Sequence, residues 1–235
     1  MSSENRCCAV IAAAGASTRM NLKMNKQFVP LLGMPAIART LRAFETAEKV
    51  ESVVLVCRTE DQEQMKIVAK GCGAKKVIAI VPGGVTRQQS VICGLAAVPD
   101  GIQWIAVHDG ARPLVRPKEI DACVADAQHY GAAALAVPVK DTIKVADEAG
   151  LIVSTPRRDL LWAVQTPQIF SLEIYESAVR QAEAENTDYT DDCQLLEHFG
   201  VKIHLCSGSY ENIKLTTPED IITAEAVLRR REETL

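Results

Sequence analysis

The sequence lacks the patterns of several protein classes. Its eight cysteines are irregularly spaced and form no C-x-x-C pair, whereas zinc sites and disulfide frameworks need tighter spacing. Several cysteines instead lie in apolar runs such as VVLVC and KIHLC. We therefore expect buried, reduced thiols that pack as small hydrophobic groups.

Blocks of one charge and long apolar runs are absent too. The 26 basic and 30 acidic residues are interspersed and give a net charge of -4, so no basic surface for nucleic acid is predicted. The longest apolar stretches fall short of the roughly 18 residues that a membrane helix needs. The N-terminal residues MSSENR do not begin a signal peptide. Together these features predict a soluble, cytoplasmic protein that binds neither membranes nor nucleic acid.

The length fits one domain with an appendage. The chain has 235 residues, and a chain of this size buries about 70% of its unfolded surface, enough for a core without metal or disulfides. No repeat, low-complexity tract or Pro/Ser-rich linker divides it. We expect a single domain over residues 1–235, with a projecting β-arm at about residues 138–157.

Short apolar runs alternate with longer amphipathic segments in the first half of the chain. The apolar runs are residues 7–13, 51–57, 75–81 and 103–109, and the amphipathic segments are residues 37–50, 60–73 and 86–98. Apolar runs without polar alternation are typical of strands buried on both faces of a parallel sheet. The pattern predicts an α/β fold, a Rossmann-like three-layer sandwich with a mostly parallel sheet. Right-handed crossovers bring the C-terminal ends of its strands, and any ligand crevice, to one edge.

The second half is less regular. After a helix at residues 119–131 and a strand at 132–138, short β-rich pieces flank a turn at Glu148 to Gly150 and predict a hairpin. The remaining predicted elements are a helix from Leu172 to about Glu185, another from Asp191 to Phe199, a strand at 201–206 and a final helix opened by Thr217, Pro218 and Glu219. An isolated two-stranded arm is marginal in water, so the hairpin needs a partner.

A loop of small residues follows the first predicted strand. Ala13, Ala14 and Gly15 carry almost no side chain, which lets backbone amides approach a ligand, and Arg19 and Lys26 follow them. Cations beyond a strand tip match a triphosphate. The loop is neither G-x-G-x-x-G nor a Walker A motif, which argues against a dehydrogenase and a P-loop ATPase. A tight turn beside solvated cations is the alternative.

Two further clusters follow later strands of the same sheet. In PGGVTRQQS, the Gly83–Gly84 pair allows a backbone turn against a planar base, or Thr86 or Ser90 simply begins the next helix. In HDGARP, Asp109 at a strand tip suits a ribose hydroxyl or a hydrated magnesium ion. The alternative for Asp109 is an Asp-Gly turn that is ion-paired with Arg112.

The last clusters lie in the second half. PRRDLLWAVQTPQ supplies Arg158 and Thr166, and YENIKLTTPED supplies Lys214; solvated surface cations are the alternative for both basic groups. The four histidines lack ligand or triad spacing and are assigned to structure. Trp104 and Trp162 are expected to fill the core.

Together these motifs resemble one family over nearly the whole chain. AAAGASTRM with NKQF, PGGVTRQQSV, HDGARP, PVKDTIK, QTPQ and NIKLTTPED occur in this order and resemble the 2-C-methyl-D-erythritol 4-phosphate cytidylyltransferases. The resemblance implies transfer of CMP from CTP to 2-C-methyl-D-erythritol 4-phosphate. The products would be 4-diphosphocytidyl-2-C-methyl-D-erythritol and pyrophosphate, on the non-mevalonate route to isoprenoid precursors.

The resemblance also implies roles for individual residues. Arg19 and Lys26 would stabilise the transition state, and Arg158 and Lys214 would align the nucleophile. The expected nucleotide contacts are Ala13, Ala14, Gly15, Gly84, Ser90, Asp109 and Gly110, and the expected sugar-phosphate contacts are Thr142, Arg158, Thr166 and Lys214. Many relatives carry an acidic residue where this chain has Val85, which leaves base selection to the backbone here.

Magnesium and a second subunit complete this expectation. Mg²⁺ would sit mainly on CTP phosphates and water, with Asp109 at most a contributing ligand. Arms of two subunits would interlock in a homodimer and bring Thr142 and Arg158 towards the neighbour's active site. Ribitol 5-phosphate cytidylyltransferase, a non-catalytic nucleotide sensor, and uridylyl or guanylyl transfer to a sugar phosphate remain alternatives.

Overall fold

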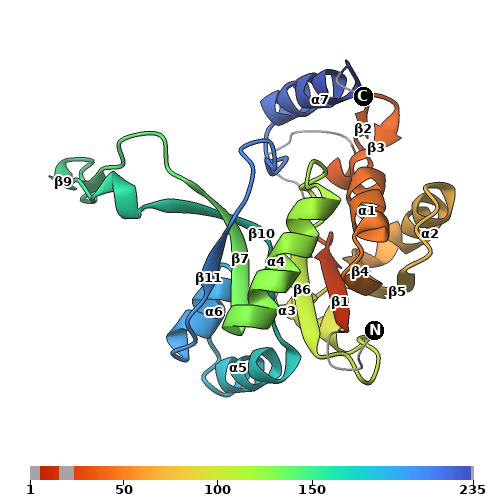
Figure 1. Ribbon diagram of the computed structural model, residues 1–235, viewed down its shortest axis with the longest axis horizontal. Coiled ribbons are helices and arrows are strands. Elements are labelled where there is room, and N and C mark those ends of the chain that lie inside the picture. The colour runs from red at the N-terminus through yellow and green to blue at the C-terminus, as the bar shows by residue number, and fades with distance from the viewer. Residues whose placement is uncertain (1–5, 16–23, 234–235) are drawn as a thin grey trace.

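The core of the protein is a seven-stranded sheet (Figure 1). The computed structural model describes residues 6–15 and 24–233. In spatial order the strands are β11 (His204–Ser207), β7 (Ala132–Pro138), β10 (Trp162–Ser171), β6 (Trp104–Asp109), β1 (Cys7–Ala12), β4 (Val50–Cys57) and β5 (Val77–Pro82). β10 pairs antiparallel with both of its neighbours, and the other pairings are parallel. The mostly parallel sheet is therefore confirmed.

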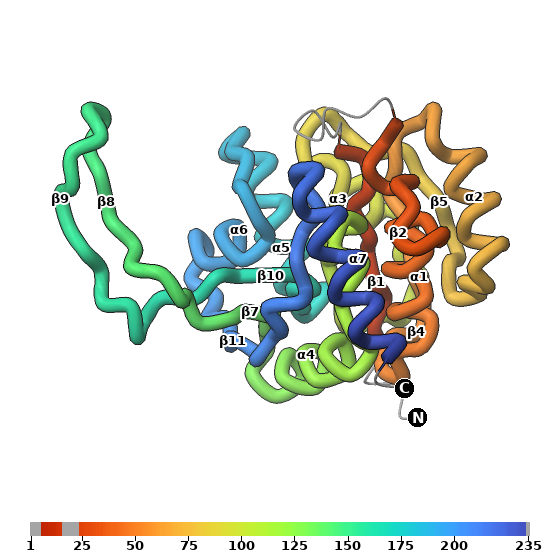
Figure 2. The backbone as a smooth tube through the Cα atoms, turned by 90° about the horizontal axis from the view of Figure 1, so that it is seen from above, coloured from red at the N-terminus to blue at the C-terminus, as the bar shows by residue number. Residues whose placement is uncertain are grey.

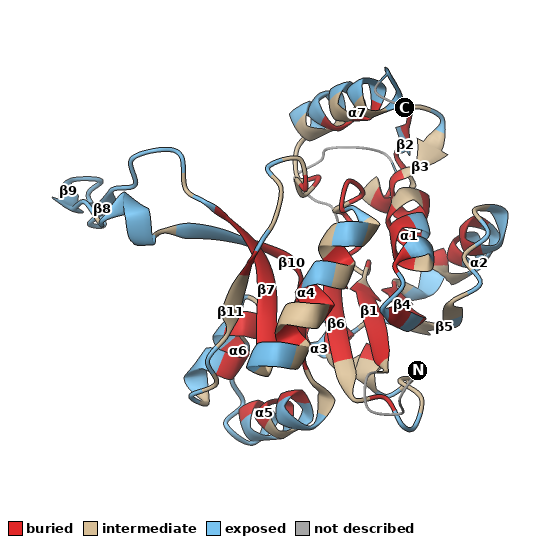
Figure 3. Ribbon diagram, in the orientation of Figure 1, coloured by how far each residue is buried: buried red, intermediate tan, exposed pale blue. Residues whose placement is uncertain are grey.

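Helices cover both faces of this sheet. Side chains alternate along β1, so that Cys7 and Ile11 lie in one apolar cluster while Cys8 and Val10 lie in another. The first cluster includes α1 (Ala36–Thr46), α2 (Gln62–Gly71) and α4 (Pro117–Tyr130), and the second includes α3 (Arg87–Leu95), α5 (Leu172–Ala184) and α6 (Asp192–His198). Figure 3 shows the buried residues concentrated in the strands between these helices. The three-layer prediction is confirmed.

A third apolar cluster attaches the last helix. α7 (Pro218–Glu233) packs Leu228 with Leu31 and Leu114. Leu31 belongs to a small hairpin of β2 (Pro30–Leu31) and β3 (Met34–Pro35), and two 3₁₀ turns, η2 (Lys26–Phe28) and η3 (Thr59–Asp61), lie in the first half. α7 thus lies over the same sheet edge as the strand tips (Figure 1).

The predicted hairpin projects from the rest of the molecule as a long arm (Figure 2). It consists of β8 (Val145–Ala146) and β9 (Ile152–Ser154), followed by the 3₁₀ turn η4 (Arg158–Leu160). The Asp147 carboxylate accepts hydrogen bonds from the amides of Ala149 and Leu151 and closes the turn. Residues 141–155 are all exposed, including the apolar Leu151 and Val153.

Some sequence expectations were wrong. No strand was expected at Trp162–Ser171, yet β10 lies in the middle of the sheet. Trp162 lies where β10 enters the arm and is 37% exposed, so it does not fill the core, whereas Trp104 is partly buried and packs against the first apolar cluster. The prediction of reduced, buried thiols is confirmed for six of the eight cysteines: all eight are free, and only Cys72 and Cys93 are partly exposed. Within the described residues, no helix is both long and apolar enough to cross a membrane.

Candidate active site

The loops after β1 and β5 touch at the carboxyl edge of the sheet. The amide of Ala13 donates to the carbonyl of Val56, and the amide of Gly83 donates to the carbonyl of Cys57, so both loops are hydrogen-bonded to the end of β4. A Cβ on Gly83 would lie 2.5 Å from the Cβ of Ala14, which means that only glycine fits there. The two small-residue motifs therefore form one continuous backbone surface, which continues into the exposed Gly15.

The glycine turn is locked onto the start of α3. Thr86 caps this helix and forms a capping box with Gln89. The buried Ser90 hydroxyl accepts from the Gly84 amide at 3.1 Å and contacts the Thr86 carbonyl at 2.9 Å. Val85 is 96% exposed and contributes only its amide, which donates to the Gln89 side chain. Thr86, rather than Ser90, begins the helix, and Ser90 fixes the turn.

Asp109, at the tip of β6, faces three cations. Its Oδ2 lies 2.8 Å from Lys214 Nζ and 3.7 Å from Arg112 Nε, while its Oδ1 lies 3.3 Å from Arg87 Nε. Burial acts to raise the pKa of this carboxyl, but Arg87, Lys214 and Arg112 outweigh burial and hold the pKa well below its usual range. Asp109 is therefore ionised at neutral pH, and its surroundings carry a net positive charge suited to an anion.

Thr166 connects β10 to the same strand tip. Its hydroxyl accepts from the Asp109 amide at 3.0 Å and lies 3.0 Å from His108 Nδ1. Because the Arg112 carbonyl, 3.3 Å from His108 Nε2, can only accept, Nε2 carries the proton of the neutral ring, and Nδ1 accepts from the Thr166 hydroxyl. Burial lowers the pKa of His108 to about 3, so the ring is neutral. The predicted structural role of His108 fits this network.

Two of the predicted cations reach this edge from opposite ends of the chain. Lys26 donates from Nζ to the carbonyl of Leu215 at 3.0 Å, which places it against the residue that follows Lys214. The amide of Leu215 in turn donates to the carbonyl of Ala111, near the predicted contact Gly110. A Cβ on Gly110 would lie about 3 Å from the side chains of Ile37 and Gln27, so this turn is tightly packed.

The arm residues lie apart from this cluster within one chain. Thr142 is exposed on the arm, and Arg158 donates to the carbonyl of Lys140, which also belongs to the arm. Figure 2 shows the arm extending away from the strand tips. The predicted Arg19 lies outside the described residues. The structure thus brings Ala13, Ala14, Gly84, Ser90, Asp109, Gly110, Thr166, Lys26 and Lys214 to one edge and leaves Thr142 and Arg158 on the arm.

Comparison with known proteins identifies the family to which the chain belongs. The family model for 2-C-methyl-D-erythritol 4-phosphate cytidylyltransferase matches residues 7–230. The chain belongs to this family.

Individual members of the cytidylyltransferase family match over nearly their full length. A protein of that name from Pelotomaculum thermopropionicum is 46% identical over 229 residues, which cover 97% of this chain and 96% of that protein. One from Desulforamulus reducens is 45% identical over 224 residues, 95% of this chain and 96% of its own. The crystal structure of 4-diphosphocytidyl-2C-methyl-D-erythritol synthase from Anaerococcus prevotii superposes with a TM-score of 0.85 at 28% identity, covering 97% of each chain.

Asp109 does not fit a direct metal ligand in this cytidylyltransferase fold. Both of its oxygens face cations, as described above, and a divalent ion there would have to displace them. In the described part of the chain, no group of three or more His, Cys, Asp or Glu side chains is arranged to hold a metal.

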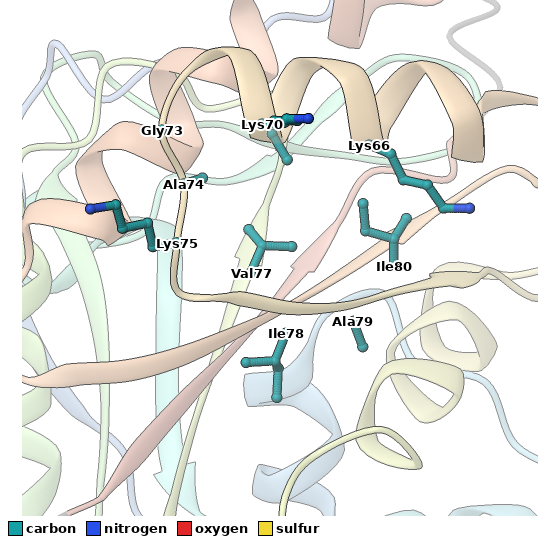
Figure 4. A pocket seen from close by; sticks show the side chains of 10 residues that line it. Lys66, Lys70, Gly73, Ala74, Lys75, Val77, Ile78, Ala79 and Ile80 are labelled. Carbon is teal, nitrogen blue, oxygen red and sulfur yellow. The ribbon is translucent and has the colours of Figure 1, made fainter.

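A pocket of about 520 Å³ lies elsewhere, between α2 and β5 (Figure 4). Lys66, Lys70 and Lys75 line it, together with the apolar side chains of Val77 and Ile80. It contains none of the predicted site residues, so it is not the candidate active site.

Sequence reasoning missed Arg87 and Asp192. Arg87 Nη2 lies 2.7 Å from Asp192 Oδ2, and Asp192 is 3% exposed. A usable signal was present at Arg87, because it occupies the first turn of α3, where the helix dipole disfavours a cation. A cation in that position needs acidic partners. Arg112 was foreseen only as an ion-pair partner of Asp109, which it is.

Proposed function

We propose that the protein transfers CMP from CTP to 2-C-methyl-D-erythritol 4-phosphate, giving 4-diphosphocytidyl-2-C-methyl-D-erythritol and pyrophosphate, in isoprenoid precursor biosynthesis. Membership of the cytidylyltransferase family supports this reaction. The geometric observation that carries it is the meeting of Asp109, Lys214 and Lys26 beside a small-residue backbone surface. That combination offers cations for two phosphate-bearing reactants and a backbone surface that a nucleotide can approach closely.

The nucleotide lies across the tips of β1, β5 and β6 in this proposal. The edge of the cytosine base lies against the Gly84 turn, where backbone carbonyls accept hydrogen bonds from the cytosine amino group. Ser90 acts by holding that turn, because its hydroxyl is already bonded to Gly84 and Thr86. Asp109 accepts from a ribose hydroxyl, and Ala13, Ala14, Gly15 and Gly110 supply close backbone contacts.

The chemistry requires charge neutralisation rather than proton transfer. The attacking phosphate oxygen is already ionised near neutral pH, so no general base is needed. Attack on the α-phosphorus builds charge in a crowded in-line transition state, which Lys26 and Arg19 stabilise. Lys214 and Arg158 align the acceptor phosphate, with Thr142 and Thr166 as further contacts. The neutral, buried His108 takes no part in this chemistry.

Magnesium enters this proposal as part of the nucleotide. Mg²⁺ would bind mainly to CTP and water rather than to Asp109, and when bound it would supply neutralisation of phosphate charge. This assignment follows from the cations that already surround Asp109.

The arm suits a homodimer. Its exposed apolar side chains Leu151, Ile152 and Val153 have too little of their own hairpin to pack against. In the dimer, Thr142 and Arg158 reach the partner's active site, which explains why neither joins the site of its own chain. We further propose a single nucleotidyltransferase domain, residues 1–235, that works in the cytoplasm.

Release of pyrophosphate tests the function. With CTP and Mg²⁺, we expect rapid release in the presence of 2-C-methyl-D-erythritol 4-phosphate and at least tenfold slower release with ribitol 5-phosphate, since recognition of one extra group contributes about 1 to 3 kcal/mol. CTP binding without release would identify a nucleotide sensor. Preference for ribitol 5-phosphate, or for UTP or GTP as donor, would overturn the proposed substrates.

A further inference from the structure

A chain of polar contacts runs from the middle of the α5–α6 layer to the Asp109 carboxylate. Gln168, on β10, accepts through Oε1 from the amides of Asp192 and Cys193, and so fixes the start of α6. The Tyr175 hydroxyl, on α5, donates to Asp192 Oδ1 at 2.5 Å. Asp192 is thereby held from two elements, and its buried Oδ2, which accepts no hydrogen bond from the described residues, forms an ion pair with Arg87.

Arg87 joins this chain to the candidate site. Its Nη2 contacts Asp192 Oδ2 at 2.7 Å, and its Nε contacts Asp109 Oδ1 at 3.3 Å. A guanidinium is planar and holds its nitrogens in a fixed relation, so fixing one end on Asp192 also fixes the other end. Arg87 therefore restrains Asp109 Oδ1, while Lys214 and Arg112 lie near Oδ2.

We propose that Arg87, anchored by Asp192 and Tyr175, is a positioning residue that holds the Asp109 carboxylate in the orientation that receives the CTP ribose. This rests on the proposed function. Both Arg87 and Asp192 lie on the layer of α3, α5 and α6, whereas Lys214 contacts the other carboxylate oxygen, Oδ2. The restraint therefore acts directly on the proposed ribose contact and reaches the acceptor residue Lys214 only through Asp109.

The decisive variant removes the restraint without leaving a buried charge unpaired. In Arg87→Met alone, Asp192 loses its counter-ion and the protein loses stability. The double variant Arg87→Met/Asp192→Asn removes both charges, and the amide oxygen of the new side chain still accepts from Tyr175. We expect its melting temperature to recover at least half of the loss, while the Kd for CTP stays raised about tenfold, the effect of losing one hydrogen bond to a charged group.

Other readouts separate positioning from a merely structural role. The KM for 2-C-methyl-D-erythritol 4-phosphate is expected to change less than twofold, and Arg87→Lys is expected to restore part of the CTP affinity, because one ammonium replaces part of the fork. Tyr175→Phe keeps the stacking on Phe170 and is expected to raise the Kd for CTP by a smaller factor. Arg6→Met, which breaks the Arg6–Glu51 ion pair at the opposite end of β1, serves as the matched control and is expected to bind CTP normally.

Two results would overturn the inference. One is a double variant that binds CTP as tightly as the wild type. The other is a set of variants whose Kd values simply follow their melting temperatures, with both substrates affected equally. A wild-type protein without cytidylyl transfer would instead refute the proposed function, and direct measurement of CTP binding still tests Arg87 in that case.

Discussion

At the scale of single residues, the candidate site consists of charged groups that are held by specific neighbouring residues. Asp109 is buried and still ionised because three cations face it. Lys26 is held by a backbone carbonyl, and the turn that carries it is capped by Asn25, whose amide donates to Asp61 at 2.7 Å. A lysine that is fixed in this way loses little conformational freedom when a phosphate arrives.

Substituting Lys26 tests its role in the transition state. Lys26→Met is expected to lower kcat by about 100-fold, equivalent to roughly 3 kcal/mol, as for other lost donors to developing charge. The KM for CTP should change much less, because the charge that Lys26 stabilises is largest in the transition state. Steady-state kinetics measure both values. A rise in KM with unchanged kcat would show that Lys26 only binds the ground state.

His108 gives a pH dependence of stability. Burial lowers the folded-state pKa to about 3, whereas an unfolded histidine titrates near 6.5. Below pH ~6.5 the unfolded chain takes up a proton that the folded protein excludes, so stability falls as the pH drops towards 3. We expect His108 to account for about 2 kcal/mol of stability lost between pH 7 and pH 5.

Urea unfolding at the two pH values measures this loss. In His108→Gln, which cannot titrate, the difference between pH 7 and pH 5 should shrink by that amount, while the other histidines remain as a common background. An equal pH dependence in wild type and variant would mean that His108 is protonated in the folded state.

At the scale of elements, the loop between β5 and α3 depends on close packing. A Cβ on Gly84 would lie 2.4 Å from the Cβ of Gln89, the residue that completes the capping box of α3. Any side chain at position 84 must therefore move the turn or the helix start. The backbone surface proposed for the base would move with it.

Gly84→Ala is accordingly expected to destabilise the fold by about 1 to 3 kcal/mol, the usual range for overpacking, and to raise the Kd for CTP at least tenfold. Thermal unfolding and titration calorimetry measure the two effects. Gly71→Ala is the matched control: at the end of α2, its Cβ meets no heavy atom within 4 Å among the described residues. Normal CTP affinity in Gly84→Ala would refute a role for this turn.

Element patterns also show what the sequence could and could not predict. β1, β4, β5 and β6 were predicted because each is a short apolar run; β1, β4 and β6 are mostly buried, whereas β5, at the edge of the sheet, is only partly buried and exposes Ile78. β10 was not predicted, because Gln165, Thr166 and Pro167 interrupt it, and the pairing with β7 shifts register between Val164 and Gln168. The polar side chains of Gln165 and Thr166 do not fit the pattern of a buried strand, but both form hydrogen bonds with other segments. Gln165 accepts from Asn212, and Thr166 accepts from the Asp109 amide.

The sequence predicted some residues of the candidate site and missed others. Asp109, Gly84 and Lys214 follow strand tips in recognisable motifs, and the fold brings strand tips together whatever lies between them. Arg87 was missed because its two carboxylates come from distant segments, β6 and α6, and no local pattern reports such a meeting. Trp162 was misassigned because an aromatic residue in an apolar strand usually faces the core, whereas this strand continues into an exposed arm.

At the scale of the whole molecule, the arm is the part that does not pack against the rest of its own chain. Leu151, Ile152 and Val153 are each about two-thirds exposed, and the apolar clusters on the two faces of the sheet do not include them. Association through the arm therefore adds buried apolar surface without rearranging the core.

In the proposed homodimer, charge on the arm is expected to separate the two subunits. Ile152→Asp/Val153→Asp should give a monomer in sedimentation velocity, with an unchanged melting temperature of the core and at least tenfold lower activity, because Thr142 and Arg158 no longer reach a neighbouring site. Ile67→Asp, on equally exposed α2, should remain dimeric and active. A fully active monomer would show that each chain is self-sufficient.

The order in which the site's residues occur along the chain bears on synthesis. Ala13 and Lys26 leave the ribosome early, Asp109 near the midpoint, and Lys214 close to the end. Domains generally fold as units, and the ammonium that meets Asp109 and the carbonyl that holds Lys26 both arrive with residues 214 and 215. In the proposed mechanism, a nascent polypeptide therefore consumes no nucleotide before residues 214 and 215 have been synthesised.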